Sequence, residues 1–147
     1  HGHAAVLAWL AESRHWSTPL HHVTLPPHLF PPERARALLR AGADVHARAA
    51  GAADAPSPLE LAAAQQPRGE AAALVLRAAE VIERTGRPIS GPWTPDTHQF
   101  FPAEARARAV PALLVYRHVC EALALGDNKQ VALKDAWLVG AMPHAME

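Results

Sequence analysis

The chain has 147 residues, with 14 basic and 14 acidic side chains and a single cysteine, a length typical of one domain. Because its charge is balanced and it contains no basic block, nucleic acid is not expected as the main partner. The uninterrupted apolar stretches, such as residues 110–116, are far shorter than the roughly 20 residues that span a bilayer. Membrane insertion is therefore not expected either.

The cysteine content bears on the compartment. Cys120 alone cannot build a disulfide framework, which favours a reducing setting inside the cell. We therefore expect an intracellular, cytoplasmic protein. An organelle stays open, because the sequence begins at His1 and a targeting segment before it would not be seen.

The composition predicts short helices. Alanine supplies 33 residues, whereas phenylalanine, tryptophan and tyrosine together supply eight, and alanine is the best helix former while strand formers are scarce. The 14 prolines are more than usual, and proline ends helices. We expect an all-α fold built from short helices that proline and glycine separate.

The predicted elements begin with an apolar stripe that indicates a helix near residues 3–13. Thr18, followed by proline, is a typical N-cap of a second helix. A proline-rich stretch at 25–32 delays the next helix to Glu33, and Gly42 fits the left-handed position that ends a helix.

The sequence pattern that begins the helix at Thr18 occurs a second time. Ser57, followed by proline and leucine, repeats the cap after a loop at 47–56 and starts a helix to about Gln65. A longer helix is expected over about 70–84, and Gly86 closes it.

This unit of capped opening, turn, second helix, glycine and loop resembles an ankyrin repeat. The resemblance rests on Thr-Pro-Leu-His at 18–21, on Leu-Leu-Arg-Ala-Gly-Ala-Asp-Val-His-Ala at 38–47 and on Ser-Pro-Leu-Glu-Leu-Ala-Ala at 57–63. It implies an ankyrin-type helical solenoid of short antiparallel helix pairs. Residues 1–86 would form the ankyrin-like repeats, and 87–147 a helical C-terminal extension that caps the array.

The resemblance gives the motif residues architectural roles. Thr18 resembles the capping residue, and His21 the histidine whose ring ties neighbouring turns together. Glu60, which stands where the second unit would carry that histidine, departs from the pattern. Ser57 follows Thr18 by 39 residues instead of the ankyrin period of about 33, and the loops at 25–32 and 47–56 take up the excess.

The extension opens with three of the eight aromatic residues, and we expect these to be buried against the last helix pair: Trp93, Phe100 and Phe101. A helix is predicted from Ala103, with a kink or a restart at Pro111. The outer face of the extension is a second candidate contact surface through its basic residues, Arg106, Arg108 and Arg117.

Periodicity predicts which side of that helix is buried. Apolar positions recur in alternating steps of four and three residues, as in a helix with one covered side, at Leu113, Tyr116, Cys120 and Leu123. A final short helix is predicted to carry Val131, Trp137 and Leu138.

No motif in the sequence encodes catalysis or metal binding. The adjacent His21 and His22 would point about 100° apart on a helix, so they cannot chelate one ion as residues four apart do. The sequence contains no Cys-x-x-Cys, His-Glu-x-x-His or Gly-x-Ser-x-Gly motif and no phosphate-binding glycine loop. We expect no enzyme, cofactor, metal site or small-molecule substrate.

The favoured function is a non-catalytic protein–protein interaction module, an ankyrin-repeat scaffold or adaptor whose partner is another protein or a multi-subunit complex. The candidate contacts are residues that the fold does not need. They lie in the loops that join successive repeat units, which we call fingers, and at the end of the first helix of the second unit: Arg14, His15, Trp16, His46, Arg48, Gln65 and Gln66. The alternative is a small structural subunit permanently embedded in a large multi-protein assembly, because the loops at 25–32 and 47–56 suit wrapping better than packing.

Overall fold

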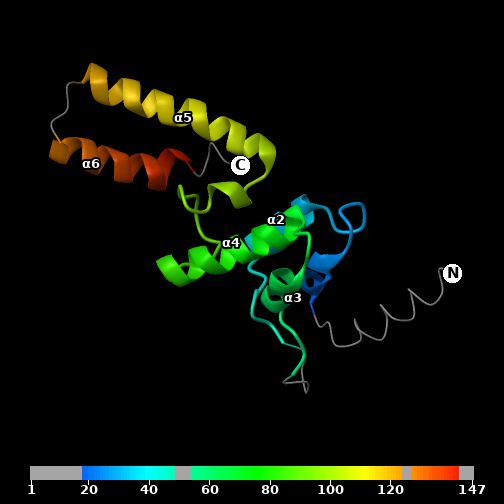
Figure 1. Cartoon of the computed structure of the whole chain (residues 1–147). Coiled ribbons are helices and arrows are strands. Elements are labelled where there is room, and N and C mark those ends of the chain that lie inside the picture. Colours follow the sequence, from blue (N-terminus) through cyan, green and yellow to red (C-terminus); the bar gives the residue numbers. More distant parts are fainter. Residues whose placement is uncertain (1–17, 49–53, 124–126, 143–147) are drawn as a thin grey trace.

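The computed structural model describes residues 18–48, 54–123 and 127–142 (Figure 1). Within these ranges every regular element is helical and no strand occurs, in agreement with the all-α expectation. The helix expected near residues 3–13 lies outside the described residues. The elements in chain order are η1 (Pro19–Thr24), α2 (Pro32–Arg40), α3 (Pro58–Ala64), α4 (Glu70–Thr85), η2 (His98–Phe100), α5 (Ala103–Ala122), α6 (Asp127–Ala136) and η3 (Trp137–Ala141).

The described helices form two groups that the segment 86–102 connects (Figure 1). In the first, α4 packs against both α2 and α3, and η1 packs against α3. In the second, α5 and α6 run side by side as a helical hairpin, and the π-helical η3 continues α6. None of the described helices combines the length and the hydropathy needed to cross a membrane.

The two predicted caps form as expected, with different chemistry. The backbone N–H of Thr18 donates to Nδ1 of His21 at 3.3 Å, and the Thr18 hydroxyl lies 2.9 Å from the same nitrogen. At α3 the backbone N–H of Ser57 donates to the Glu60 carboxylate at 2.8 Å, while the Glu60 N–H donates to the Ser57 hydroxyl at 3.2 Å. Glu60 therefore completes at α3 the reciprocal cap that His21 completes at η1.

Both predicted glycine stops are confirmed. Gly42 and Gly86 have φ values of 89° and 64°, in the left-handed region where a side chain would be strained. The Gly86 N–H donates to the carbonyl of Ile82 at 2.8 Å, which satisfies one of the last carbonyls of α4.

The main core joins the first helix group to the extension. Residues of η1, α2, α3 and α4 share one buried cluster with Ile89 and Phe100, and Phe100 is fully buried. A second cluster surrounds α5 and contains Trp93, Phe101, Ala105, Ala109 and Met142. Trp93, Phe100 and Phe101 are all buried as expected, but only Phe100 lies in the core of the helix pairs, whereas Trp93 and Phe101 lie in the second cluster at α5.

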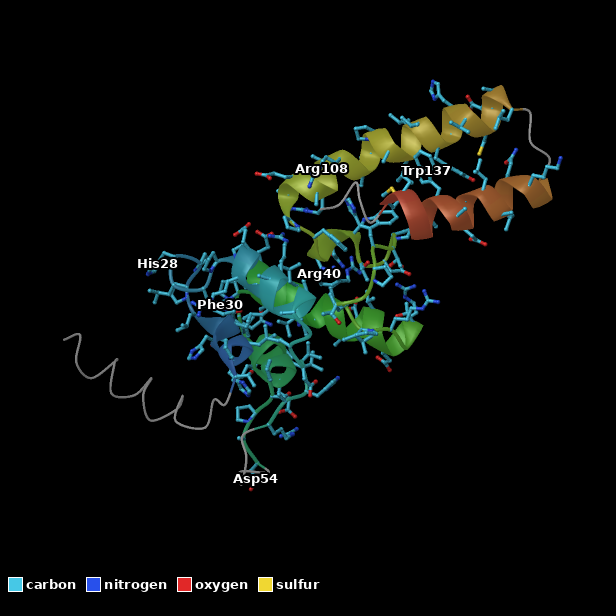
Figure 2. The ribbon with its side chains drawn as sticks, turned by 180° about the vertical axis from the view of Figure 1, so that it is seen from behind. His28, Phe30, Arg40, Asp54, Arg108 and Trp137 are labelled. Atoms are coloured by element: carbon cyan, nitrogen blue, oxygen red, sulfur yellow. The ribbon has the colours of Figure 1, made fainter. Side chains whose placement is uncertain are left out.

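Two arginines of α2 hold the connecting segment by its carbonyl groups. Arg36 donates from Nε to the carbonyl of Gln99 at 3.2 Å. Arg40 (Figure 2) donates from Nη1 to the carbonyls of Ile89 and Gly91 at 2.6 and 2.5 Å, and its guanidinium lies 3.9 Å from the centre of the Phe101 ring. These backbone carbonyls lose their contact with water on folding, and the guanidinium groups replace it with charge-assisted hydrogen bonds.

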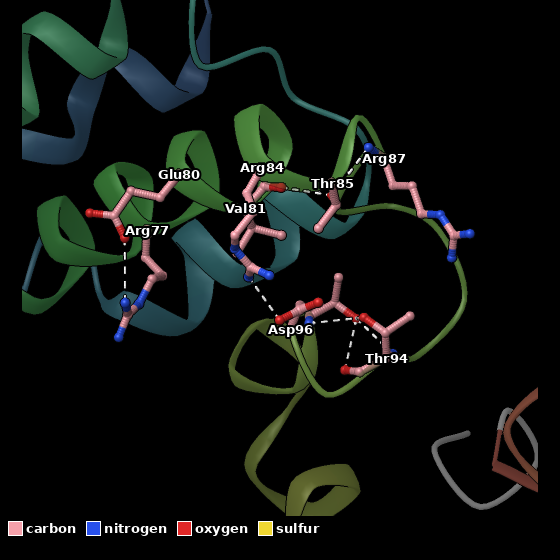
Figure 3. Close-up of polar contacts among 9 residues, drawn as sticks. Arg77, Glu80, Val81, Arg84, Thr85, Arg87, Thr94 and Asp96 are labelled. Carbon is pink, nitrogen blue, oxygen red and sulfur yellow. Dashed lines mark hydrogen bonds and ion pairs between the residues drawn. The ribbon is translucent and has the colours of Figure 1, made fainter. Parts of the chain in front are cut away.

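The connecting segment is also attached to α4. Arg84 forms an ion pair with Asp96, with 2.8 Å between Nη2 and Oδ1 (Figure 3). Thr94 and Thr97 bond reciprocally, since the N–H of each donates to the hydroxyl of the other at 2.9 and 3.2 Å. This turn places Trp93 and His98 beside α5.

Of the kink or restart predicted at Pro111, the restart is wrong, because α5 is one continuous helix from Ala103 to Ala122. A proline leaves the carbonyl four residues earlier without its helical donor, and here that residue is Ala107. Both Ala107 and Pro111 are exposed, so water can solvate the carbonyl and the helix continues.

The predicted buried side of α5 is only partly correct. Cys120 is buried and Tyr116 is half-buried, but Leu113 and Leu123 are 39 and 60 % exposed. The covered side instead follows small residues, because Ala105 and Ala109 let α5 approach the aromatic cluster closely.

Candidate interaction surface

The side of α5 that faces away from its packed residues is also apolar. Val110, Leu114 and Val115 are 57, 51 and 52 % exposed, and Ala107 and Pro111 are exposed as well. At 100° per residue these positions share one stripe, centred about 170° from the stripe of Ala105, Ala109, Ala112, Tyr116 and Cys120. We call Ala107, Val110, Pro111, Leu114 and Val115 the α5 outer face.

An apolar groove adjoins the α5 outer face. It has a volume of about 310 Å³ and lies between α5, the end of α6 and the turn at 93–98, with Trp93, Val110, Leu113, Tyr116, Lys134 and Trp137 among its walls. We call it the aromatic groove. Because Val110 belongs to both, the groove and the α5 outer face form one continuous surface.

Contacts across the hairpin shape the aromatic groove. The Tyr116 hydroxyl donates to the carbonyl of Gln130 at 3.0 Å, and its ring centre lies 6.0 Å from that of Trp137. Trp137 is the first residue of η3 and lies beside α5 (Figure 2). The indole N–H of Trp93 donates to Nδ1 of His98 at 3.2 Å, so this imidazole nitrogen acts as an acceptor.

Burial lowers the pKa values of His21 and His98 below the ordinary histidine value, and at His98 the positive charge of Arg106 lowers the pKa further. The unfolded chain therefore takes up protons at these positions before the folded chain does, as pH falls through about 6.5. The resulting stability is present above that pH and is lost below it.

We accordingly expect the melting temperature, followed by circular dichroism, to fall between about pH 7 and pH 5.5. A His98→Gln substitution should reduce this pH dependence. Replacement of His28, which is exposed, should leave it unchanged. A melting temperature that is constant over this range would contradict the expectation.

The contact residues predicted from sequence do not gather at this surface. Arg14, His15 and Trp16 lie outside the described residues. His46 is exposed, and its backbone N–H donates to the Asp44 carboxylate at 2.9 Å. His46 lies between α2 and α3 in the first helix group, and Asp54, which is labelled in Figure 2 and lies between the same two helices, is on the side of the molecule away from the hairpin.

Two of the predicted contacts make internal bonds. Arg48 donates to the carbonyl of Ala55 at 2.9 Å and forms an ion pair with Glu60, so it ties the base of the finger to α3. Gln65 donates from Nε2 to the carbonyl of Thr24 at 3.2 Å. Gln66 is exposed. The bonds of Arg48 and Gln65 give them roles within the fold.

The α5 outer face was missed because its pattern competes with another. The stretch from Ala105 to Cys120 carries small or apolar residues on both sides of the helix, and periodicity identifies a single stripe. The sequence did contain a signal, namely that apolar residues occur on two opposite sides of this helix. A helix of that kind needs a partner on each side.

Comparisons with protein-family profiles, with curated proteins and with solved structures found no match. Within the described ranges, no group of three or more histidine, cysteine, aspartate or glutamate side chains is placed to hold a metal ion.

Proposed function

We propose that this chain is a non-catalytic protein–protein interaction module, an ankyrin-type array whose C-terminal hairpin carries the contact surface. The α5 outer face is the observation that supports the proposal most. Large apolar side chains are exposed there in a continuous stripe, and such patches mark interaction sites on proteins that are otherwise well packed. Full burial of such a side chain contributes roughly 1.5–3 kcal/mol, and covering Val110, Leu114 and Val115, which are about half exposed, would contribute about half of that for each.

The ankyrin-type arrangement is supported by the repeated unit itself. Thr18 and Ser57 cap equivalent helices, and Gly42 and Gly86 end the helices that follow. The ring of His21 is fully buried next to the backbone of Ala47 and Pro56, which suits the role of tying neighbouring turns.

The embedded structural subunit is favoured by a separate observation. Leu123 and Val131, at the far end of the hairpin, are 60 and 59 % exposed, so apolar exposure extends to both helices. A permanently assembled neighbour could cover all of it. Sedimentation and thermal melting of the isolated chain separate the two functions, because an adaptor should be a monomer with a cooperative melt and an obligate subunit should aggregate.

The interaction function predicts that Val110→Glu combined with Leu114→Glu abolishes co-purification of partner proteins from the source cell. Both side chains are more than half exposed, so the melting temperature should stay within a few degrees of the parent value. Pull-down with mass spectrometry gives the first measurement and circular dichroism the second.

The matched control is Leu29→Glu. Leu29 is 55 % exposed but lies in the loop before α2, away from the hairpin, so its replacement should leave the set of partners unchanged. If the α5 double variant retains every partner, the hairpin is not the contact surface.

A further inference from the structure

The shape of the aromatic groove suits an anchoring side chain. Its volume of about 310 Å³ is at the lower end of ligand pockets, and its walls include the rings of Trp93, Tyr116 and Trp137. A single large apolar side chain inserted in such a pocket is the usual centre of a protein interface.

The surroundings of the groove contain hydrogen-bond donors without acceptors. The indole Nε1 of Trp137 and the Nε of Arg106 are both buried and have no partner among the described residues. Arg106 lies close enough to His98, a wall residue, to lower its pKa. Lys134 also lines the groove, and its described walls include no aspartate or glutamate. The carboxylate of Asp135 lies close enough to Tyr116, a wall residue, to raise its pKa. Buried donors without acceptors favour a ligand that brings oxygen atoms.

The charges of the hairpin also favour a ligand that carries oxygen atoms. Arg117 and Glu121 of α5 form an ion pair with each other. Among the other described side chains of α5 and α6, two are acidic, Glu104 and Asp135, and make no ion pair within the described chain. Four are basic and also make none: Arg106, Arg108, Lys129 and Lys134. A partner that carries carboxylates would complement this surface and would bind faster at low salt.

The apolar surface is too long for a small molecule alone. It leaves the groove at Leu113 and Val110 and continues to Leu114 and Val115 along α5. A ligand confined to the groove would leave that stripe in water, whereas an amphipathic helix would cover it with residues three and four positions apart.

We propose, on the basis of the proposed interaction function, that the hairpin binds an acidic amphipathic helix of a partner protein. One large apolar residue of that helix fills the aromatic groove, and the next apolar residues cover Val110 and Leu114. Its carboxylates lie at the edge of the groove, which Lys134 lines, and they complement the cationic side chains of the hairpin.

The test uses the full chain and two synthetic amphipathic peptides of about 18 residues, or five helical turns. Both peptides have the same phenylalanine and leucine face, but one carries glutamate and the other lysine at the polar positions. Calorimetry should show binding of the glutamate peptide and at least about tenfold weaker binding of the lysine peptide. Affinity for the glutamate peptide should fall as salt is added.

Variants locate the site. Lys134→Glu should weaken binding of the glutamate peptide by about tenfold, and Leu113→Glu should abolish it. Arg68→Glu, which changes the same charge on an exposed residue of the turn between α3 and α4, should have no effect. Circular dichroism melts verify that each variant is folded.

Three results would overturn the proposal. Equal binding of both peptides would show a merely apolar surface, and binding of neither would exclude this partner chemistry. Sedimentation of the chain as a dimer that Leu114→Glu dissociates would identify a second copy as the occupant. Loss of partners in the Val110 and Leu114 double variant would still support the interaction function after any of these results, so the two hypotheses fail separately.

Discussion

Replacing Phe100 by alanine is expected to lower the free energy of unfolding by about 3–5 kcal/mol, the range for removing a fully buried aromatic side chain. Phe100 has no exposed surface and lies in the main core. Because it comes from the extension, its removal should weaken the attachment of residues 87–147 as well as the packing of the helix pairs. Urea unfolding followed by circular dichroism measures the loss.

Leu114→Ala is the control for the Phe100 variant. Its side chain is 51 % exposed on the α5 outer face, so its removal should change stability by about 0.5 kcal/mol or less. A loss below about 1 kcal/mol for Phe100→Ala would mean that the core can do without the extension, and the two groups of helices would then unfold independently.

Local features of this fold follow from sequence because their causes lie within a few residues. The caps at Thr18 and Ser57 need a hydroxyl and an acceptor three positions later. The stops at Gly42 and Gly86 need a residue that tolerates positive φ. In each case the sequence contains all the groups that take part, so the structure agrees with the prediction.

The attachment of the extension could not be predicted in the same way. Arg36 meets the carbonyl of Gln99 across 63 positions of the chain, and nothing near Arg36 in sequence distinguishes it from Arg34, which is exposed. Burial of an arginine is decided by carbonyl groups that arrive from a distant segment. Such pairs become visible only when the tertiary fold is known.

The candidate surface shows a second kind of limit. The sequence identifies α5 as a helix with apolar stripes, but Leu113 and Leu123 fit the pattern of a buried seam as well as Ala105 and Ala109 do. Which stripe is covered depends on the shape of the neighbour. Alanines admit the close approach of Trp93 and Met142, and the larger side chains are left at the edge of the contact and on the α5 outer face.

The second large effect is expected at Arg40. Arg40→Met should lower the free energy of unfolding by about 2–4 kcal/mol, because two carbonyls of the connecting segment lose a charged donor and the Phe101 ring loses the cation above it. Arg40→Lys should cost about half as much, since an ammonium group keeps the charge but not the planar donor group. Chemical denaturation of the three proteins compares them directly.

Arg34 provides the matched control for this prediction. Its guanidinium also lies over a ring, 5.6 Å from the centre of Phe30. Arg34 is exposed, however, and within the described part of the chain it donates no hydrogen bond to a carbonyl of the connecting segment 86–102. Arg34→Met should therefore cost less than about 1 kcal/mol. A double-mutant cycle of Arg40→Met with Phe101→Leu should give a coupling energy of about 0.5–2 kcal/mol. If Arg40→Met costs no more than Arg34→Met, the carbonyls of Ile89 and Gly91 are solvated without Arg40, and α2 does not hold the extension.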